Sequence, residues 1–138
     1  MATMQSRIVH VRIERNWKLV YDFASRPENM PLWASGLGDG FRRDGDEWIA
    51  TGPLGSVRVR FAPRNEFGVI DHEVTMETGL KVHNALRVVP NGDGAEVMFT
   101  LLKVPDMTDA SFAADEANVR KDLETLKALM EFEGASRS

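Results

Sequence analysis

The sequence predicts an α+β fold in which a curved antiparallel sheet of about seven strands wraps around a long C-terminal helix. Three observations predict it: an alternating segment near the N-terminus, a series of short strands joined by tight turns, and one long amphipathic helix at the C-terminus. The expected order is one strand, two short helices, six strands and a final helix, with antiparallel neighbours. All 138 residues are expected to form a single domain with an ordered core over about residues 7–133.

The N-terminal part is expected to hold a strand and two short helices. Residues 7–14 alternate between apolar and polar side chains, which is typical of a half-buried strand. Asn16 can cap a helix over residues 17–24, where apolar side chains recur at helical spacing. Pro27 ends that helix and can open a second one that runs to about Trp33.

The middle of the chain is expected to form six strands in a meander. Gly, Asp and Asn separate the apolar runs, and these residues tolerate the positive φ angles of tight turns. Residues 91–94 (Asn-Gly-Asp-Gly) give the strongest hairpin signal, and the glycine-rich residues 36–40 are interpreted as a loop at the rim of a pocket. The predicted strands cover residues 41–43, 47–51, 56–62, 69–76, 80–89 and 95–104.

The C-terminal helix is expected to be capped by Thr108 or Asp109 and to end at Gly134. No other segment is long and amphipathic enough to cover the apolar face of the sheet. Because a single helix cannot fill the concave side of a strongly twisted sheet, a cavity is expected between them. The apolar stripe of the helix consists of Phe112, Val119, Leu123, Leu126 and Met130.

Three segments resemble the START-like (SRPBCC) superfamily, and within it the polyketide cyclase/dehydrase and lipid-transport type. They are the opening strand with residues 16–23 (Asn-Trp-Lys-Leu-Val-Tyr-Asp-Phe), residues 26–33 (Arg-Pro-Glu-Asn-Met-Pro-Leu-Trp) and the closing helix. The second is similar to the family's Asp-Pro-Glu-x-x-x-x-Trp helix end, with Arg26 in place of the usual Asp. Residues 68–72 and 99–101 resemble uncharacterised bacterial members.

The resemblance covers about residues 7–132 and implies the helix-grip fold with a ligand pocket. It implies no particular reaction, because the family shares a pocket and no universal catalytic residue. The predicted function is therefore the binding of a small hydrophobic molecule such as a lipid, a polyketide or an aromatic metabolite. The residues expected to line the pocket are Trp33, Trp48, Val59, Phe61, Ile70, His72, Val74, Met76, Asn84, Leu86, Met98, Val119 and Leu123.

His72 is the candidate catalytic residue. Strand alternation places it on the same face as Ile70, Val74 and Met76, whereas Asp71 and Glu73 should be solvated on the opposite face. Imidazole titrates near neutrality, so His72 could act as acid and base in a cyclase, dehydratase or isomerase. The alternative interpretation is a buried neutral histidine that is hydrogen-bonded to a neighbour, so whether the protein is an enzyme stays open.

Asn84 is expected on the apolar, inner face of its strand. A buried amide must find hydrogen-bonding partners, which could be a ligand carbonyl or a group on a neighbouring strand.

Composition excludes several classes of site. The chain has no cysteine, so disulfides, thiolate zinc sites and cysteine nucleophiles are excluded, and its three histidines lack metal-ligand spacing. We expect no cofactor. The net charge of −4 argues against nucleic acid, and no apolar run is long enough to span a membrane. A cytoplasmic location is expected, and the sequence leaves open a homodimer formed through a sheet edge and an interaction module that regulates a partner.

Overall fold

The structure, a computed structural model, describes residues 2–35, 40–52 and 55–136. The predicted rim loop over residues 36–40 therefore lies outside the described residues, apart from Gly40. The predicted order of one strand, two short helices, six strands and one long helix is confirmed. The elements are β1 (Ser6–Ile13), α1 (Trp17–Ala24), the 3-10 helix η1 (Pro27–Leu32), β2 (Gly40–Asp44), β3 (Glu47–Gly52), β4 (Gly55–Phe61), β5 (His72–Thr75), β6 (Lys81–Asn91), β7 (Gly94–Leu102) and α2 (Asp109–Ser136).

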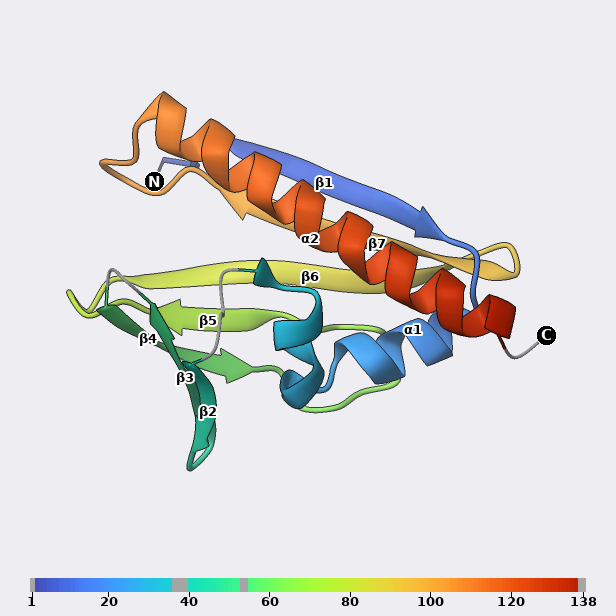
Figure 1. Cartoon of the computed structure of the whole chain (residues 1–138). Helices are drawn as coiled ribbons and strands as arrows, with labels where there is room; N and C mark the ends of the chain where they lie inside the picture. Colours follow the sequence, from blue (N-terminus) through green and yellow to red (C-terminus); the bar gives the residue numbers. More distant parts are fainter. Residues whose placement is uncertain (1, 36–39, 53–54, 137–138) are drawn as a thin grey trace.

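The strands form one seven-stranded antiparallel sheet in the order β1-β7-β6-β5-β4-β3-β2. Strands β2 to β7 follow one another as a meander, and β1 lies beside β7, so β1 and β2 form the two edges (Figure 1). The alternation predicted for the first strand is confirmed, since Val9, Val11 and Ile13 are buried while the residues between them are exposed. Inner residues of β1, β6 and β7 belong to one core cluster with residues of α1 and α2.

Helix α2 runs diagonally along β1 and β7, and α1 and η1 lie beside it over the middle of the sheet (Figure 1). The hydroxyl of Thr108 accepts the backbone N–H of Ser111 at 3.1 Å, which makes Thr108 the N-terminal cap. The helix continues through Gly134 to Ser136, so the end predicted at Gly134 is wrong. A glycine inside a helix costs only about 1 kcal/mol and does not by itself end it.

The apolar stripe predicted on α2 is confirmed. Phe112, Leu123, Leu126 and Met130 are buried, and Val119 is half-buried. Leu123, Leu126 and Met130 belong to one core cluster with the inner residues of β1 and β7. Among the described residues, no helix is long and apolar enough to cross a membrane.

Strand β5 is shorter than the strand predicted over residues 69–76, because Asp71 interrupts the backbone pairing. Its carboxylate accepts the backbone N–H of Leu86 at 3.0 Å and two hydrogen bonds from the guanidinium of Arg87 at 3.0 and 2.7 Å. The Asp71 side chain is only 13% exposed, so the expectation that it is solvated is wrong. The hydrogen bonds from Arg87 hold the pKa of Asp71 below its usual value.

Candidate functional site

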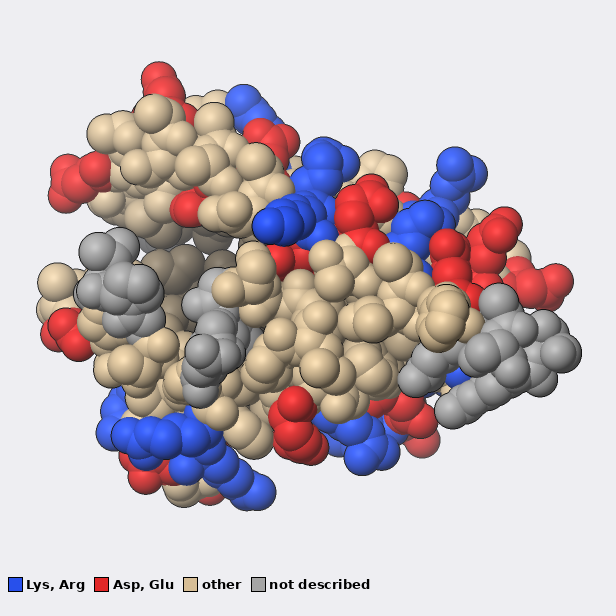
Figure 2. Space-filling view, viewed as in Figure 1, with Lys and Arg blue, Asp and Glu red and all other residues tan. Residues whose placement is uncertain are grey.

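A cavity of about 270 Å³ lies between the inner face of the sheet, η1 with the residues after it, and α2. On the face seen in Figure 2, the surface is hollowed beneath the N-terminal half of α2. The described wall is apolar except for His72, Asn84, Asp122 and the indole of Trp33. The residues that line it are Met30, Trp33, Ala34, Phe41, Val57, Val59, Phe61, His72, Val74, Asn84, Leu86, Phe99, Val119, Asp122 and Leu123.

Most of the residues that the sequence placed in the pocket lie in this wall. They come from the inner faces of the central strands, the end of η1 and the apolar stripe of α2, where alternation and helical spacing put them. These residues are Trp33, Val59, Phe61, His72, Val74, Asn84, Leu86, Val119 and Leu123.

Two predicted methionines lie outside the cavity. Met98 is paired with His10 and Arg87 on the outer face of the sheet, because the inner face of β7 carries Val97 and Phe99. Met76 follows the end of β5 and is 40% exposed. The prediction that Met98 lines the pocket is therefore wrong.

Trp48 and Ile70 also lie outside the cavity wall. Trp48 shares the inner face with its cross-strand neighbour Val59, but its ring stacks on Phe41 with centroids 4.9 Å apart. Phe41 is the member of this stacked pair that lines the cavity. Ile70 precedes β5 and is 2% exposed in the core, where its N–H donates to the carbonyl of Leu86 at 2.8 Å.

Sequence reasoning missed part of the wall. Strand alternation could have identified Val57 and Phe99, because Val57 lies on the same face as Val59 and Phe99 lies on the same face as Val97. Phe41 lies on a strand too short for alternation to assign its face. The full set of missed residues is Met30, Ala34, Phe41, Val57, Phe99 and Asp122.

Asp122 links α2 to the residues that follow η1 at the edge of the cavity. Its carboxylate accepts hydrogen bonds from the backbone N–H of Ser35 at 3.1 Å and from the Ser35 hydroxyl at 2.9 Å. This contact links the chain after η1 to α2, so two of the segments that roof the cavity are tied to each other. No spacing rule in the sequence points to this long-range pair.

The imidazole of His72 has a defined tautomer. Its Nδ1 lies 3.0 Å from the carbonyl oxygen of Ile70, and a carbonyl can only accept, so Nδ1 carries the proton. Nε2 therefore presents its lone pair, and Nδ2 of Asn84 lies 3.5 Å from it. The ring packs beside Phe61 and Phe99, with centroid distances of 5.4 and 6.2 Å.

Burial lowers the pKa of His72 below its usual value of 6.5. The hydrogen bond to Ile70 and the negative charge of Asp71 oppose this effect and offset only part of it. His72 is therefore neutral at neutral pH. The side chain lines the cavity and is only half-buried, so we assign its accessible part to the cavity.

Asn84 is the direct cross-strand partner of His72, so the two side chains project from adjacent strands onto the same inner face. The contact with Nε2 of His72 is long for a hydrogen bond and correspondingly weak. Among the described residues, the indole N–H of Trp33 is the one fully buried side-chain polar atom without a partner. Such an unsatisfied donor costs about 1–3 kcal/mol.

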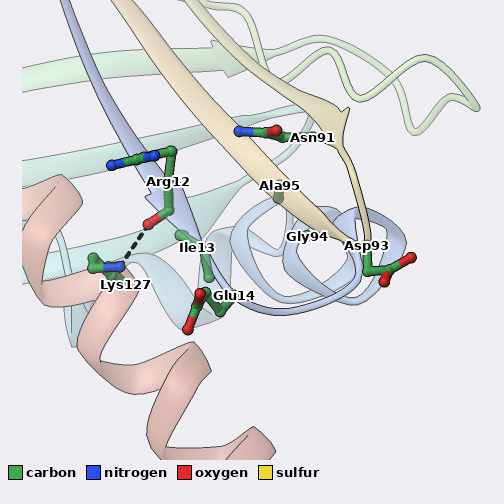
Figure 3. A pocket seen from close by; sticks show the side chains of 8 residues that line it. All are labelled: Arg12, Ile13, Glu14, Asn91, Asp93, Gly94, Ala95 and Lys127. Carbon is green, nitrogen blue, oxygen red and sulfur yellow. Dashed lines mark hydrogen bonds between the residues drawn. The ribbon is translucent and has the colours of Figure 1, made fainter.

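A second hollow, of about 520 Å³, lies at the other end of the sheet beside the β6–β7 turn. It is larger, but its walls are mixed polar and apolar, whereas the wall of the first cavity is mainly apolar. Figure 3 shows that Asp93 points away from Lys127, whose ammonium instead donates to the carbonyl of Arg12 at 2.7 Å. The charged groups do not converge on one point, so we place the candidate site in the smaller, apolar cavity.

No group of three His, Asp or Glu side chains in the described part of the chain is arranged to hold a metal ion.

The fold is shared with proteins of very different sequence. No protein-family model matches the chain, and no curated protein matches it. The solved structure of the Aha1 dimer from Colwellia psychrerythraea is similar with a TM-score of 0.75 and 12% identity, covering 93% of this chain and 97% of that one. Protein MLL2253 from Mesorhizobium loti is similar with a TM-score of 0.73 and 9% identity, covering 92% and 97%.

DynU16, a protein of the dynemicin biosynthetic locus, has a TM-score of 0.70 and 11% identity, covering 91% of this chain and 47% of that one. At these identities the likeness shows the fold alone. It confirms the helix-grip fold, a curved antiparallel sheet with a long C-terminal helix, that the sequence predicted.

The pKa of His72 predicts how stability depends on pH. Because the folded-state pKa lies below the unfolded value, the unfolded state binds the proton more readily between the two values. The free energy of unfolding should therefore fall as the pH drops below about 6.5, by about 1.4 kcal/mol for each unit of difference between the two pKa values. Urea denaturation at a series of pH values measures this loss.

The substitution His72→Gln should reduce this loss in acid, whereas His83→Gln should keep it, because the His83 side chain is 63% exposed on the outer face. An acid profile that is identical in His72→Gln and the parent protein would contradict a buried neutral His72.

Proposed function

We propose that the protein binds a small hydrophobic molecule in the cavity between the sheet and α2. One observation carries the proposal: the wall is almost wholly apolar, with only a few polar groups, and among these the half-buried His72 and Asn84 lie side by side. Small-molecule sites commonly combine such apolar walls with a few polar groups that orient the ligand. Burial of apolar surface would supply the affinity, at about 25 cal/mol per Å² before ordering costs.

Filling the cavity should weaken this binding. Val119→Phe adds a ring to the α2 side of the wall, and it should weaken the binding of naphthalene by at least about tenfold. Amide NMR titration with naphthalene measures the affinity and shows which residues respond. The matched control is Ala117→Phe, which lies on the exposed face of the same helix and should bind naphthalene as the parent does.

Responses spread over the surface, or equal affinities in both variants, would contradict binding in this cavity.

A second candidate function is acid–base catalysis on a bound ketone or enol, as in a cyclase, dehydratase or isomerase. The observation that favours it is the lone pair of His72 Nε2, which the Ile70 contact leaves available on a side chain that lines the cavity. DynU16, which shares this fold, belongs to a biosynthetic locus. In this role His72 would remove a proton beside the ligand carbonyl and return it at another atom.

This role predicts that the protein speeds the exchange of the methyl protons of acetophenone in heavy water, followed by NMR. His72→Leu should return the rate to that of the buffer, while naphthalene binding persists. Exchange that is equally fast with the parent protein and with His72→Leu would rule out His72 as the base.

Self-association through a sheet edge is also proposed. β1 and β2 are the edge strands of the described sheet, and exposed edges offer unpaired backbone groups to a second chain. The Aha1 protein from Colwellia psychrerythraea, which shares the fold, is described as a dimer.

A further inference from the structure

We infer that the cavity takes a neutral, compact aromatic molecule carrying a hydroxyl group, which donates its proton to Nε2 of His72 and accepts a hydrogen bond from the amide of Asn84. The inference rests on the proposed function and goes beyond it by naming the chemical class of the ligand. It is drawn from the polar pair in the wall, the charge of the wall and the size of the space.

The polar pair consists of an acceptor beside a donor. Nε2 of His72 is an acceptor, because the Ile70 carbonyl fixes the proton on Nδ1. Nδ2 of Asn84 is a donor, and it lies 3.5 Å from Nε2, so each group satisfies the other poorly. A hydroxyl group both donates and accepts, so one hydroxyl placed between them can satisfy both. An ether or ketone oxygen only accepts and would leave Nε2 without a donor.

The charge of the wall favours a neutral ligand. Of the described residues that line the cavity, Asp122 is the one acidic side chain. No lysine or arginine is among those lining residues. A carboxylate ligand would lose its hydration and meet a like charge without a compensating cation.

The space favours a compact, flat ligand. About 270 Å³ is slightly below the range of roughly 300–1,000 Å³ that is usual for small-molecule sites, so a compact ligand fits this space better than an extended acyl or polyketide chain. Phe61 and Phe99 pack beside the imidazole of His72, which gives aromatic walls next to the polar pair. Aromatic side chains of this kind pack well against a ring.

The test compares para-ethylphenol with para-methylanisole, two isomers of the same composition, only one of which has a hydroxyl proton. Amide NMR titration of the full chain should show para-ethylphenol binding about five- to tenfold more tightly, the gain expected for one net hydrogen bond. Para-toluate, the carboxylate of similar size, should bind at least about tenfold more weakly than para-ethylphenol. The side-chain amide resonances of Asn84 should shift with para-ethylphenol.

In His72→Leu the preference for the phenol should fall below about twofold, because the acceptor is gone. The control His83→Leu changes an exposed histidine on the outer face and should keep the parent's preference. If His72→Leu does not fold, the affinities of the two isomers are compared in the parent protein and in Asn84→Leu instead.

Equal affinities of the two isomers for the parent protein, or a preference that survives in His72→Leu, would overturn the inference. If neither isomer binds while naphthalene does, the inference fails and the proposed apolar binding stands. If naphthalene also fails to bind, both fail together.

Discussion

The inner face of a seven-stranded sheet is wider than one helix can cover, and the candidate site follows from this constraint. Helix α2 buries its stripe against the inner residues of β1 and β7 in one continuous core. Beyond that contact the inner faces of β4 and β5 need a second cover, which η1 and the chain after it provide. The Asp122–Ser35 contact ties the two covers together. The cavity is the space that these two covers and the curved sheet leave between them.

The polarity of the cavity comes from one cross-strand pair. His72 and Asn84 are opposite each other in the β5–β6 ladder, so the same alternation that turns Val74 and Leu86 inward also turns these two inward. Burial keeps the imidazole neutral, while the neighbouring Asp71 faces outward and pairs with Arg87. The sheet thus keeps its charged pair on one face and its neutral acceptor on the other. A site built in this way selects ligands by hydrogen bonding and shape, since it holds no cation among its described residues.

Periodic features of the fold could be predicted from the sequence because they depend on local spacing. The alternation around Val59 and the helical spacing of Leu123 both give a face directly, and the structure puts both residues in the cavity wall. Met98 shares the outer face of β7 with Glu96 and Thr100, so the alternation of this strand could have excluded it from the wall.

Other features depend on tertiary contacts that no local pattern carries. The strand predicted to begin at residue 69 begins only at His72, because the carboxylate of Asp71 accepts a backbone N–H from the neighbouring strand β6. Trp48 stacks on Phe41, and only Phe41 lines the cavity. This stacking depends on the register between the short strands β2 and β3. The identity of the ligand cannot be predicted from local sequence patterns, because it depends on the volume and polarity of a space that several elements enclose jointly.

The most direct test of an open, apolar space beneath α2 is a crystal structure determined under xenon pressure, since xenon enters apolar cavities without needing a specific ligand. The structure predicts a xenon site bounded by Val59, Phe99 and Leu123, with the surrounding side chains unmoved. A crystal structure in which side chains fill this space, with no xenon between the sheet and α2, would contradict the account.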